Sequence, residues 1–224
     1  ALSGHRQLLC TFLVCASVYV PVLALPHRNP GLGAGWEGAL GHVLELARLS
    51  LSVPQECPEG PDAAFPFRAK QDHAGAVCIL KLCMGCGAEI ASGSSEVFQA
   101  LRRDHASQLD LLSRQAPNAL RPQSVLVLTQ SLALVAQHSA QLAHELMSDC
   151  MAALSATPCD AALLSAAETL QRCRRQPEAL GRSLEASWPV LASLAREASP
   201  APLARLVGNA AESIPAAALP ALSA

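Results

Sequence analysis

The chain has 224 residues, of which 51% are hydrophobic and only 15% are charged, so it can bury a sizeable apolar core. Its formal net charge is −2 and it contains no basic block, so its composition gives no electrostatic footprint for nucleic-acid binding. Aromatic residues make up only 3%, and helix-forming residues dominate without β-branched runs, which predicts an all-α protein.

Residues 1–24 are predicted to be a signal peptide. The stretch from Leu8 to Leu25 is apolar, follows Arg6, and ends in the small-residue pattern Val22-Leu23-Ala24. At 18 residues it is barely long enough to span a bilayer, and the cleavage pattern favours a signal peptide over an anchor. We therefore expect a secreted, extracellular protein with no membrane insertion after cleavage.

Secretion changes how the remaining cysteines are interpreted. In an oxidising compartment they are expected to form disulfides where geometry allows. Seven remain after cleavage, an odd number, so at least one lacks a partner within the chain. They are Cys57, Cys78, Cys83, Cys86, Cys150, Cys159 and Cys173.

Three helices are predicted in the first half of the chain. Apolar residues keep helical spacing from residue 36 to 53, where Leu46 and Leu49 widen the stripe and predict burial on more than one side. Pro54 ends this helix, and a loop follows over residues 54–70. A second helix is expected over 74–91, with Gly85 and Gly87 as points of interruption, and a third from about 96 to 114.

The strongest periodicity predicts one long helix from about 124 to 154. Its stripe recurs at steps of four and three residues, as in a helix that faces a bundle; the stripe is Leu128, Leu132, Val135, Ser139, Leu142 and Leu146. Thr157 is predicted to cap the next helix, which has Pro158 in its first turn and runs to about Arg175.

Prolines are expected to cut the C-terminal region into short helices, followed by disorder from residue 213 to 224. No internal repeat of fixed period is evident. The predicted organisation is a signal peptide at 1–24, a helical bundle at 25–175 and an Ala/Pro-rich extension at 176–224. The prolines of this extension are Pro177, Pro189, Pro200, Pro202, Pro215 and Pro220.

No motif for catalysis or metal binding stands out. The pair Cys83 and Cys86 has Cys78 nearby but lacks a second ligand pair at zinc-site spacing, so structural or unpaired cysteines are the favoured interpretation. His105 falls on the apolar stripe of its helix, which favours a core histidine over a ligand. Ser, His and Asp occur without a strand–turn–helix context. We therefore expect no catalytic residue, no metal site, no cofactor and no enzymatic activity.

Two short basic clusters are interpreted as solvated helix faces. Arg102 and Arg103 form the first. The second comprises Arg172, Arg174 and Arg175.

Several segments together resemble the type I interferons. VLELARLSLSVPQECPEGPDAAFPF at 43–67 is similar to the family's first helix and following loop, and AGAVCILKL at 74–82 is similar to the start of its second helix. SSEVFQALRRDHASQLDLL at 94–112 has the register of the third helix, and HELMSDCMAAL at 144–154 resembles the end of the fourth and the start of the fifth. The order and spacing of the segments carry the resemblance, which covers roughly residues 36–156.

The resemblance implies a long-chain four- or five-helix cytokine-type bundle. It implies a disulfide between Cys57 and Cys150, which would stabilise the fold by about 4–5 kcal/mol in the chain-entropy model. The implied function is antiviral or immune signalling through a two-chain cell-surface receptor. The residues implied for receptor binding are Glu59, Asp62, Arg102, Arg103 and Asp104.

The chain also departs from the interferon pattern, and other interpretations stay open. Its first loop is acidic where the family often has a basic residue, and Met151 and Ala152 stand where the family usually has Ala-Trp. One alternative is a secreted helical-bundle inhibitor, similar to those of pectin methylesterases and invertases, on the segments 144–155 and 163–173. Another is a cytoskeletal, adhesion-type bundle over residues 124–207.

Overall fold

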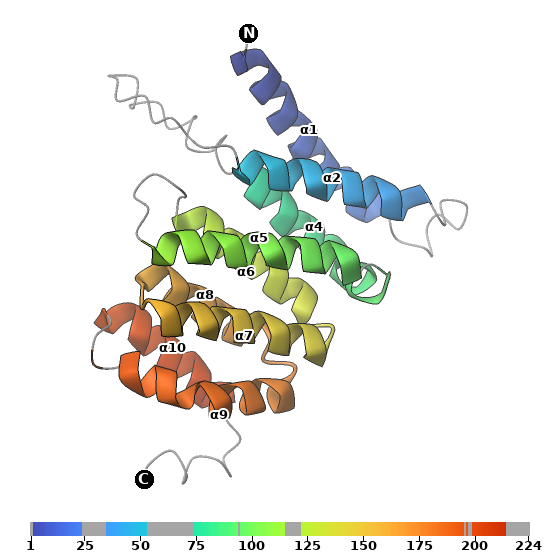
Figure 1. Cartoon of the computed structure of the whole chain (residues 1–224). Helices are drawn as coiled ribbons and strands as arrows, with labels where there is room; N and C mark the ends of the chain where they lie inside the picture. Colours follow the sequence, from blue (N-terminus) through green and yellow to red (C-terminus); the bar gives the residue numbers. More distant parts are fainter. Residues whose placement is uncertain are drawn as a thin grey trace. The chain divides into compact units, whose positions relative to one another are not determined.

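A computed structural model describes residues 2–23, 35–52, 74–93, 95–114, 122–194, 196 and 199–213. Every regular element within these ranges is an α-helix, which confirms the all-α prediction (Figure 1). The chain divides into two compact units, a first unit at Ala1–Leu101 and a second unit at Arg102–Ala224. Helix α5, Ser95–Ser113, runs through the division.

The first unit is organised around α4, Ala74–Gly93, which packs against both α1, Leu2–Leu23, and α2, Gly35–Ser52. Because α4 has neighbours on two sides, Ile79, Leu82 and Ile90 are all fully buried. Its backbone leaves helical geometry at Cys86, with φ −126° and ψ 16°, between the two glycines where an interruption was predicted.

Among the described residues, α4 also has the length and composition needed to cross a membrane, over Gly75–Ser92. Half of that stretch is buried against the rest of the fold. The apolar core helix of a soluble protein meets the same criterion, so the observation favours a core role for α4.

The outer helices of the first unit bury one face each. Leu13 of α1 is fully buried, whereas Phe12 and Tyr19 are exposed, and cleavage of this segment as a signal peptide stays a prediction. In α2, Leu46 is 36% and Leu49 46% exposed, so the prediction of burial on more than one side is wrong for these positions. Their side chains point away from the face that meets α4.

The second unit is a stack of helices in two layers (Figure 1). One layer contains α6, Pro122–Ala136, α8, Asp160–Arg172, and α10, Pro200–Ser213; the other contains the part of α5 from Arg102 on, α7, Ala140–Ala156, and α9, Pro177–Leu194. Helices pack on the helix two places further along the chain, α6 on α8, α8 on α10 and α7 on α9. The helices of the first layer begin at residues 122, 160 and 200, which are 38 and 40 residues apart. The structure therefore repeats a helical hairpin that no sequence repeat indicated.

The predicted helix over 124–154 is two helices, so that prediction is wrong. The chain turns at residues 137–139, and Ser139 is extended, with φ −146° and ψ 122°. Its hydroxyl oxygen accepts a hydrogen bond from Leu142 N at 3.4 Å, which caps the N-terminus of α7. The stripe keeps its steps of four and three residues through this turn, although its member at the turn is the polar Ser139.

The predicted cap of α8 is also wrong. Thr157 ends α7, because its backbone N–H donates to Ala153 O and continues that helix's hydrogen bonding. The N-cap of α8 is Cys159, which makes no side-chain capping bond.

Prolines act differently from the prediction in the C-terminal region. Pro177 and Pro200 occupy the first positions of α9 and α10, where the missing N–H costs nothing. Pro189 lies inside α9 and does not end it. Pro189 is exposed, so the carbonyl that loses its hydrogen bond lies on the side of the helix that faces water. The predicted extension thus supplies two helices to the second unit, and residues 214–224 lie outside the described ranges.

Candidate functional site

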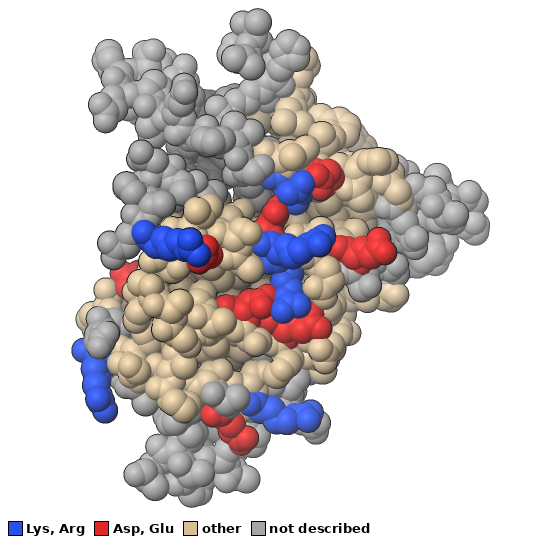
Figure 2. Space-filling model, viewed as in Figure 1, with Lys and Arg blue, Asp and Glu red and all other residues tan. Residues whose placement is uncertain are grey.

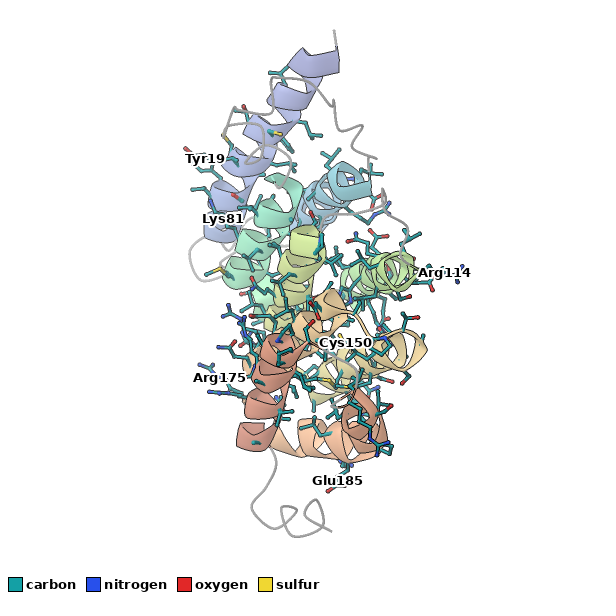
Figure 3. The ribbon with its side chains drawn as sticks, turned by 90° about the vertical axis from the view of Figure 1, so that its left-hand side faces the viewer. Tyr19, Lys81, Arg114, Cys150, Arg175 and Glu185 are labelled. Carbon is teal, nitrogen blue, oxygen red and sulfur yellow. The ribbon has the colours of Figure 1, made fainter. Side chains whose placement is uncertain are left out.

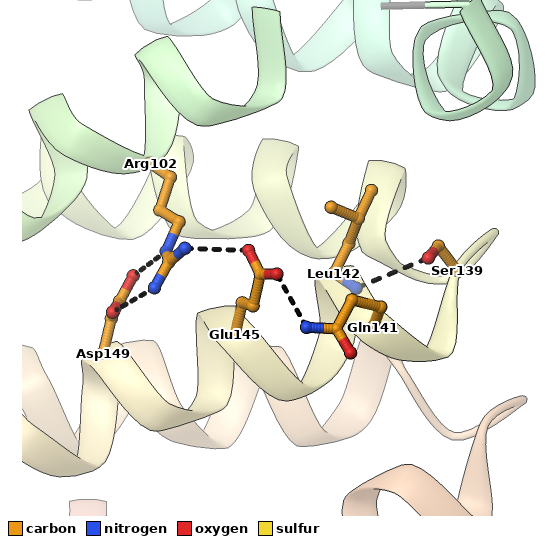
Figure 4. A network of polar contacts seen from close by, with 6 residues as sticks. All are labelled: Arg102, Ser139, Gln141, Leu142, Glu145 and Asp149. Atoms are coloured by element: carbon orange, nitrogen blue, oxygen red, sulfur yellow. Dashed lines mark hydrogen bonds and ion pairs between the residues drawn. The ribbon is translucent and has the colours of Figure 1, made fainter. Parts of the chain in front are cut away.

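Arg102 joins α5 to α7 through two carboxylates (Figure 4). Its Nε and Nη2 donate to the two Asp149 oxygens at 2.5 and 2.9 Å, and its Nη1 donates to Glu145 Oε2 at 2.7 Å. Gln141 Nε2 donates to the other Glu145 oxygen at 2.8 Å. The side chains of Arg102, Glu145 and Asp149 are 27%, 21% and 20% exposed, so this cluster, the Arg102 clamp, is partly shielded from water.

The geometry of the Arg102 clamp follows from helical spacing. Glu145 and Asp149 are four residues apart on α7, so both carboxylates lie on one face, where alone they would repel each other. The planar guanidinium presents several donors at once and can satisfy both. The hydrogen bond to Asp149 raises the pKa of Arg102, so the arginine stays charged at any physiological pH.

A buried chain of polar side chains lies one turn further along α5. His105 Nε2 is 2.5 Å from Thr129 Oγ1, which donates to Val125 O at 2.9 Å and lies 3.1 Å from Ser165 Oγ. His105, Thr129 and Ser165 are each fully buried. These contacts connect α5, α6 and α8 across the interior of the second unit.

The two ring nitrogens of His105 have different surroundings. Nε2 shares a hydrogen bond with Thr129 Oγ1, whereas Nδ1 has no hydrogen-bond partner among the described residues. Burial lowers the pKa of His105 to about 4, against the opposing charge of Asp149, so the ring is neutral at pH 7. The prediction of a core histidine is confirmed.

The cysteines of the second unit include two that belong to its interior. Cys150 Sγ lies 3.8 Å from Thr169 Oγ1, and Cys173 Sγ donates to Ala133 O at 3.7 Å. Both are free thiols, and Figure 3 shows Cys150 inside the unit. Burial raises the pKa of each thiol to about 12, which suppresses the reactive thiolate. Cys57 lies outside the described residues, so its pairing with Cys150 stays a prediction.

The three cysteines of α4 are buried as well. Burial raises the pKa of Cys78 to about 12 and that of Cys86 to about 11, and it also raises the pKa of Cys83. Within the described ranges, no three His, Cys, Asp or Glu side chains are placed to hold a metal ion. The arrangement matches the structural interpretation of the Cys83–Cys86 motif.

Three arginines gather where α8 ends and α9 begins. Arg172, Arg174 and Arg175 are all exposed, and we call them the arginine edge. The turn that carries them lies against the turn between α6 and α7, because Gln176 Nε2 donates to Gln137 O at 3.5 Å. The edge is thus built from the tips of two successive hairpins.

The residues implied for receptor binding have different surroundings. Glu59 and Asp62 lie outside the described residues. Arg102 is held in its clamp, Arg103 is exposed, and Asp104 is half-buried. The partners of Arg102, Glu145 and Asp149, were not singled out from the sequence. Their spacing of four residues is a visible signal, but it does not identify the arginine more than 40 residues away that pairs with them.

The described residues of the first unit form a depression of about 190 Å³. This volume is smaller than the roughly 300–1,000 Å³ of ordinary ligand pockets. The depression is lined by Gly41, Leu44, Glu45, Arg48, Glu96, Val97, Ala100 and Leu101. Within this lining, the hydrogen bond from Arg48 lowers the pKa of Glu45.

Figure 2 shows acidic and basic side chains interleaved over α5 and α7.

No protein-family model, curated protein or solved structure matches the chain.

Replacing Arg102 tests the clamp. Arg102→Met should lower the free energy of unfolding by roughly 1–3 kcal/mol, because it leaves two partly buried carboxylates facing each other. Arg102→Lys should cost less, since it keeps the charge but loses the planar fork. Denaturant unfolding measures both, and Arg103→Met is the matched control, expected within about 0.5 kcal/mol of the unmodified chain. Equal losses for Arg102→Met and Arg103→Met would contradict the clamp.

The buried state of His105 predicts a specific acid sensitivity. Its folded-state pKa of about 4 is below the ordinary value near 6.5, so protons bind the unfolded chain first as pH falls. The free energy of unfolding should therefore drop by up to ~3 kcal/mol between about pH 6.5 and 4 through this group alone. Unfolding curves over this range, compared with those of His105→Leu, isolate the contribution. Parallel pH profiles for the two proteins would show that His105 is not buried as a neutral ring.

Proposed function

We propose that this chain is a non-enzymatic binding protein and that its second unit is a stack of helical hairpins that docks another protein. The observation that carries the proposal is the packing of α6 on α8, of α7 on α9 and of α8 on α10, in which α6, α8 and α10 begin 38 and 40 residues apart. Stacks of helical repeats rely on contacts between neighbours and present long continuous surfaces. Such surfaces serve protein partners better than they serve small substrates.

The polar contacts between stacked helices support this proposal. His144 Nδ1 is 2.7 Å from Ser183 Oγ between α7 and α9, and Asn209 Nδ2 donates to Ala167 O at 2.8 Å between α10 and α8. The carboxylate of Glu168, itself almost completely buried, pairs with Arg205 of α10. With the Arg102 clamp, these contacts give buried polar groups a role in holding neighbouring helices together.

The chemistry of the buried groups also favours binding over catalysis. The thiols of Cys78, Cys86, Cys150 and Cys173 have raised pKa values, so the reactive thiolate is scarce at neutral pH. His105 is neutral and fully enclosed, and therefore has no access to a substrate. Among the described residues, the thiol and imidazole side chains discussed above thus have structural roles.

A second candidate is the secreted cytokine, favoured by the order of the interferon-like segments at 43–67, 74–82, 94–112 and 144–154. It would act by bringing two receptor chains together at the cell surface. Arg103 is exposed and stays a candidate contact, whereas Arg102 would have to leave its clamp to reach a receptor. This candidate depends on a bond from Cys57 to Cys150, whose sulfur is fully buried.

Site-specific photo-crosslinking tests the docking stack. A photoreactive residue is placed either at Ala152 of α7 or at Ala204 of α10, which are both exposed and belong to different layers. We expect at least one of these two variants to form a discrete crosslinked adduct with another protein. Excess unmodified chain should compete for that protein and reduce the adduct. Leu146→Asp should abolish it, because Leu146 is fully buried and the stack depends on its packing. Absence of a competed adduct from both layers would overturn the proposal.

Peptide mapping of the non-reduced protein, isolated from cells that express the full chain, separates the candidates. All thiols reduced is the expected result for the docking stack, in agreement with the buried thiols of Cys150 and Cys173. A Cys57–Cys150 peptide, with cleavage after Ala24, would support the cytokine instead. A Cys150–Cys173 peptide would support the secreted inhibitor, and either disulfide would count against the docking stack, in which both thiols are free.

A further inference from the structure

We propose that the exposed side of α1, together with a neighbouring exposed stripe of α4, binds the surface of an anionic lipid bilayer. The inference concerns the first unit and is independent of the docking stack in the second unit. It applies to the chain with residues 1–24 in place, so it competes with the prediction that these residues are removed as a signal peptide.

Helix α1 is apolar on both of its sides. Leu13 and Ala16 are buried, and α1 packs against α4 and α2. The other side carries five large apolar side chains that are exposed. At 3.6 residues per turn, these five fall within about 160° of the helix circumference. We call them the outer face of α1; they are Leu8, Phe12, Val14, Val18 and Tyr19.

The outer face of α1 gathers an unusual share of the exposed apolar surface. Among the described residues, it holds five of the eleven large apolar side chains that are exposed. Leu8 is 71% and Tyr19 65% exposed, so these side chains are open to contact. Single exposed apolar residues are ordinary, but a contiguous group marks an interaction surface. The outer face is therefore a surface that binds something apolar.

Helix α4, which packs on α1, adds an exposed stripe of its own. Val77, Lys81 and Met84 are exposed and are spaced four and three residues apart, which places them on one side of the helix. Figure 3 shows Tyr19 of α1 and Lys81 of α4 on the same side of the first unit. A lysine between two apolar side chains can lay its stem along an apolar layer and keep its ammonium among headgroups.

The scarcity of polar groups favours a bilayer over a protein partner. No charged side chain and no histidine occurs between Gln7 and Pro26. Within residues 8–20, the polar groups on the exposed side of α1 are the side chains of Thr11 and Cys15 and the hydroxyl of Tyr19. Protein interfaces surround an apolar centre with a polar rim. A bilayer requires no such rim, and a tyrosine ring suits the boundary between headgroups and acyl chains.

The length of α1 favours a position along the bilayer surface. Its apolar part, Leu8–Val20, spans about 20 Å, whereas the hydrocarbon core is about 30 Å thick. An interfacial helix on its own turns a polar side to water, but α1 turns its inner side to the rest of the first unit.

The charge of the α4 stripe favours anionic headgroups. Helix α4 contains two charged residues, Lys81, which is exposed, and Glu89, which is half-buried and lies eight residues further along. Lys81 therefore gives the exposed stripe a positive charge, and anionic lipids attract such a charge.

Sedimentation of the full chain with phospholipid vesicles tests the proposal. The vesicles contain phosphatidylcholine, either alone or mixed with phosphatidylserine, and we expect tighter binding to the mixed vesicles. The variant L8Q/F12Q/Y19Q should weaken that binding roughly tenfold or more, because three large apolar side chains no longer enter the bilayer. The control variant L46Q/L111Q/V207Q changes apolar side chains that are exposed elsewhere, and it should weaken binding less than about threefold. Circular dichroism confirms that both variants fold.

A single charge change tests the role of Lys81. The variant K81Q should weaken binding to the mixed vesicles about fivefold and leave binding to phosphatidylcholine alone unchanged. The control variant R114Q removes an exposed charge from the second unit and should leave binding to both kinds of vesicle unchanged.

Four results would overturn the proposal. Equal weakening by the two triple variants would show that the outer face of α1 has no special role. Equal binding to the two kinds of vesicle would remove the anionic lipid. Self-association that L8Q/F12Q/Y19Q abolishes, without vesicle binding by the unmodified chain, would assign the outer face to a second copy. A chain that begins at Leu25 when isolated from expressing cells would show that α1 is removed.

Discussion

The second unit depends on the enclosure of α8. Every residue from Ser165 to Leu170 is buried, which means that the middle of this helix meets neighbours on all of its sides. A helical segment with no water-facing side must satisfy its polar side chains internally, because an unpaired buried group costs roughly 1–3 kcal/mol. Ser165, Glu168 and Thr169 each have such a partner, on α6, α10 and α7 respectively. The positions of these three helices around α8 are therefore fixed by chemistry as well as by apolar packing.

In the other layer, the Arg102 clamp fixes the position of α5 relative to α7. The guanidinium can bind both carboxylates only when the two helices are in one relative register. His105 lies close by, with no partner for Nδ1 among the described residues, and the burial of its ring keeps it uncharged at neutral pH. The stack thus combines apolar packing, which is tolerant of small shifts, with polar contacts that select one arrangement.

Much of the helical content was predictable from the sequence, and the reasons for the exceptions are physical. Periodicity predicted α2, α4 and α5 closely, since these helices bury a defined face. It missed the turn at Ser139 because the stripe keeps its three- and four-residue steps through the turn. Periodicity also cannot separate a bundle from a layered stack, because both bury the same apolar face. Only contacts between distant residues, such as Arg102 with Asp149, distinguish the two.

The contacts of the candidate site were harder to predict from the sequence than the helices. Arg172, Arg174 and Arg175 were interpreted as a solvated helix face, and all three are exposed. Their position at the tips of two hairpins, in contrast, comes only from the fold. His105 was assigned to the core because its position on a stripe is a local property. Its neighbours Thr129 and Ser165 belong to other helices, and no local pattern connects them.

The hairpins are joined by short connections, at residues 137–139, 157–159 and 173–176. Because these connections are short, a tensile load on the second unit could extend the chain only by unfolding helices from the end of the stack. Each hairpin that unfolded would release 38 to 40 residues, or about 130 Å of extended chain. Under such a load the second unit would lengthen in discrete steps, one hairpin at a time.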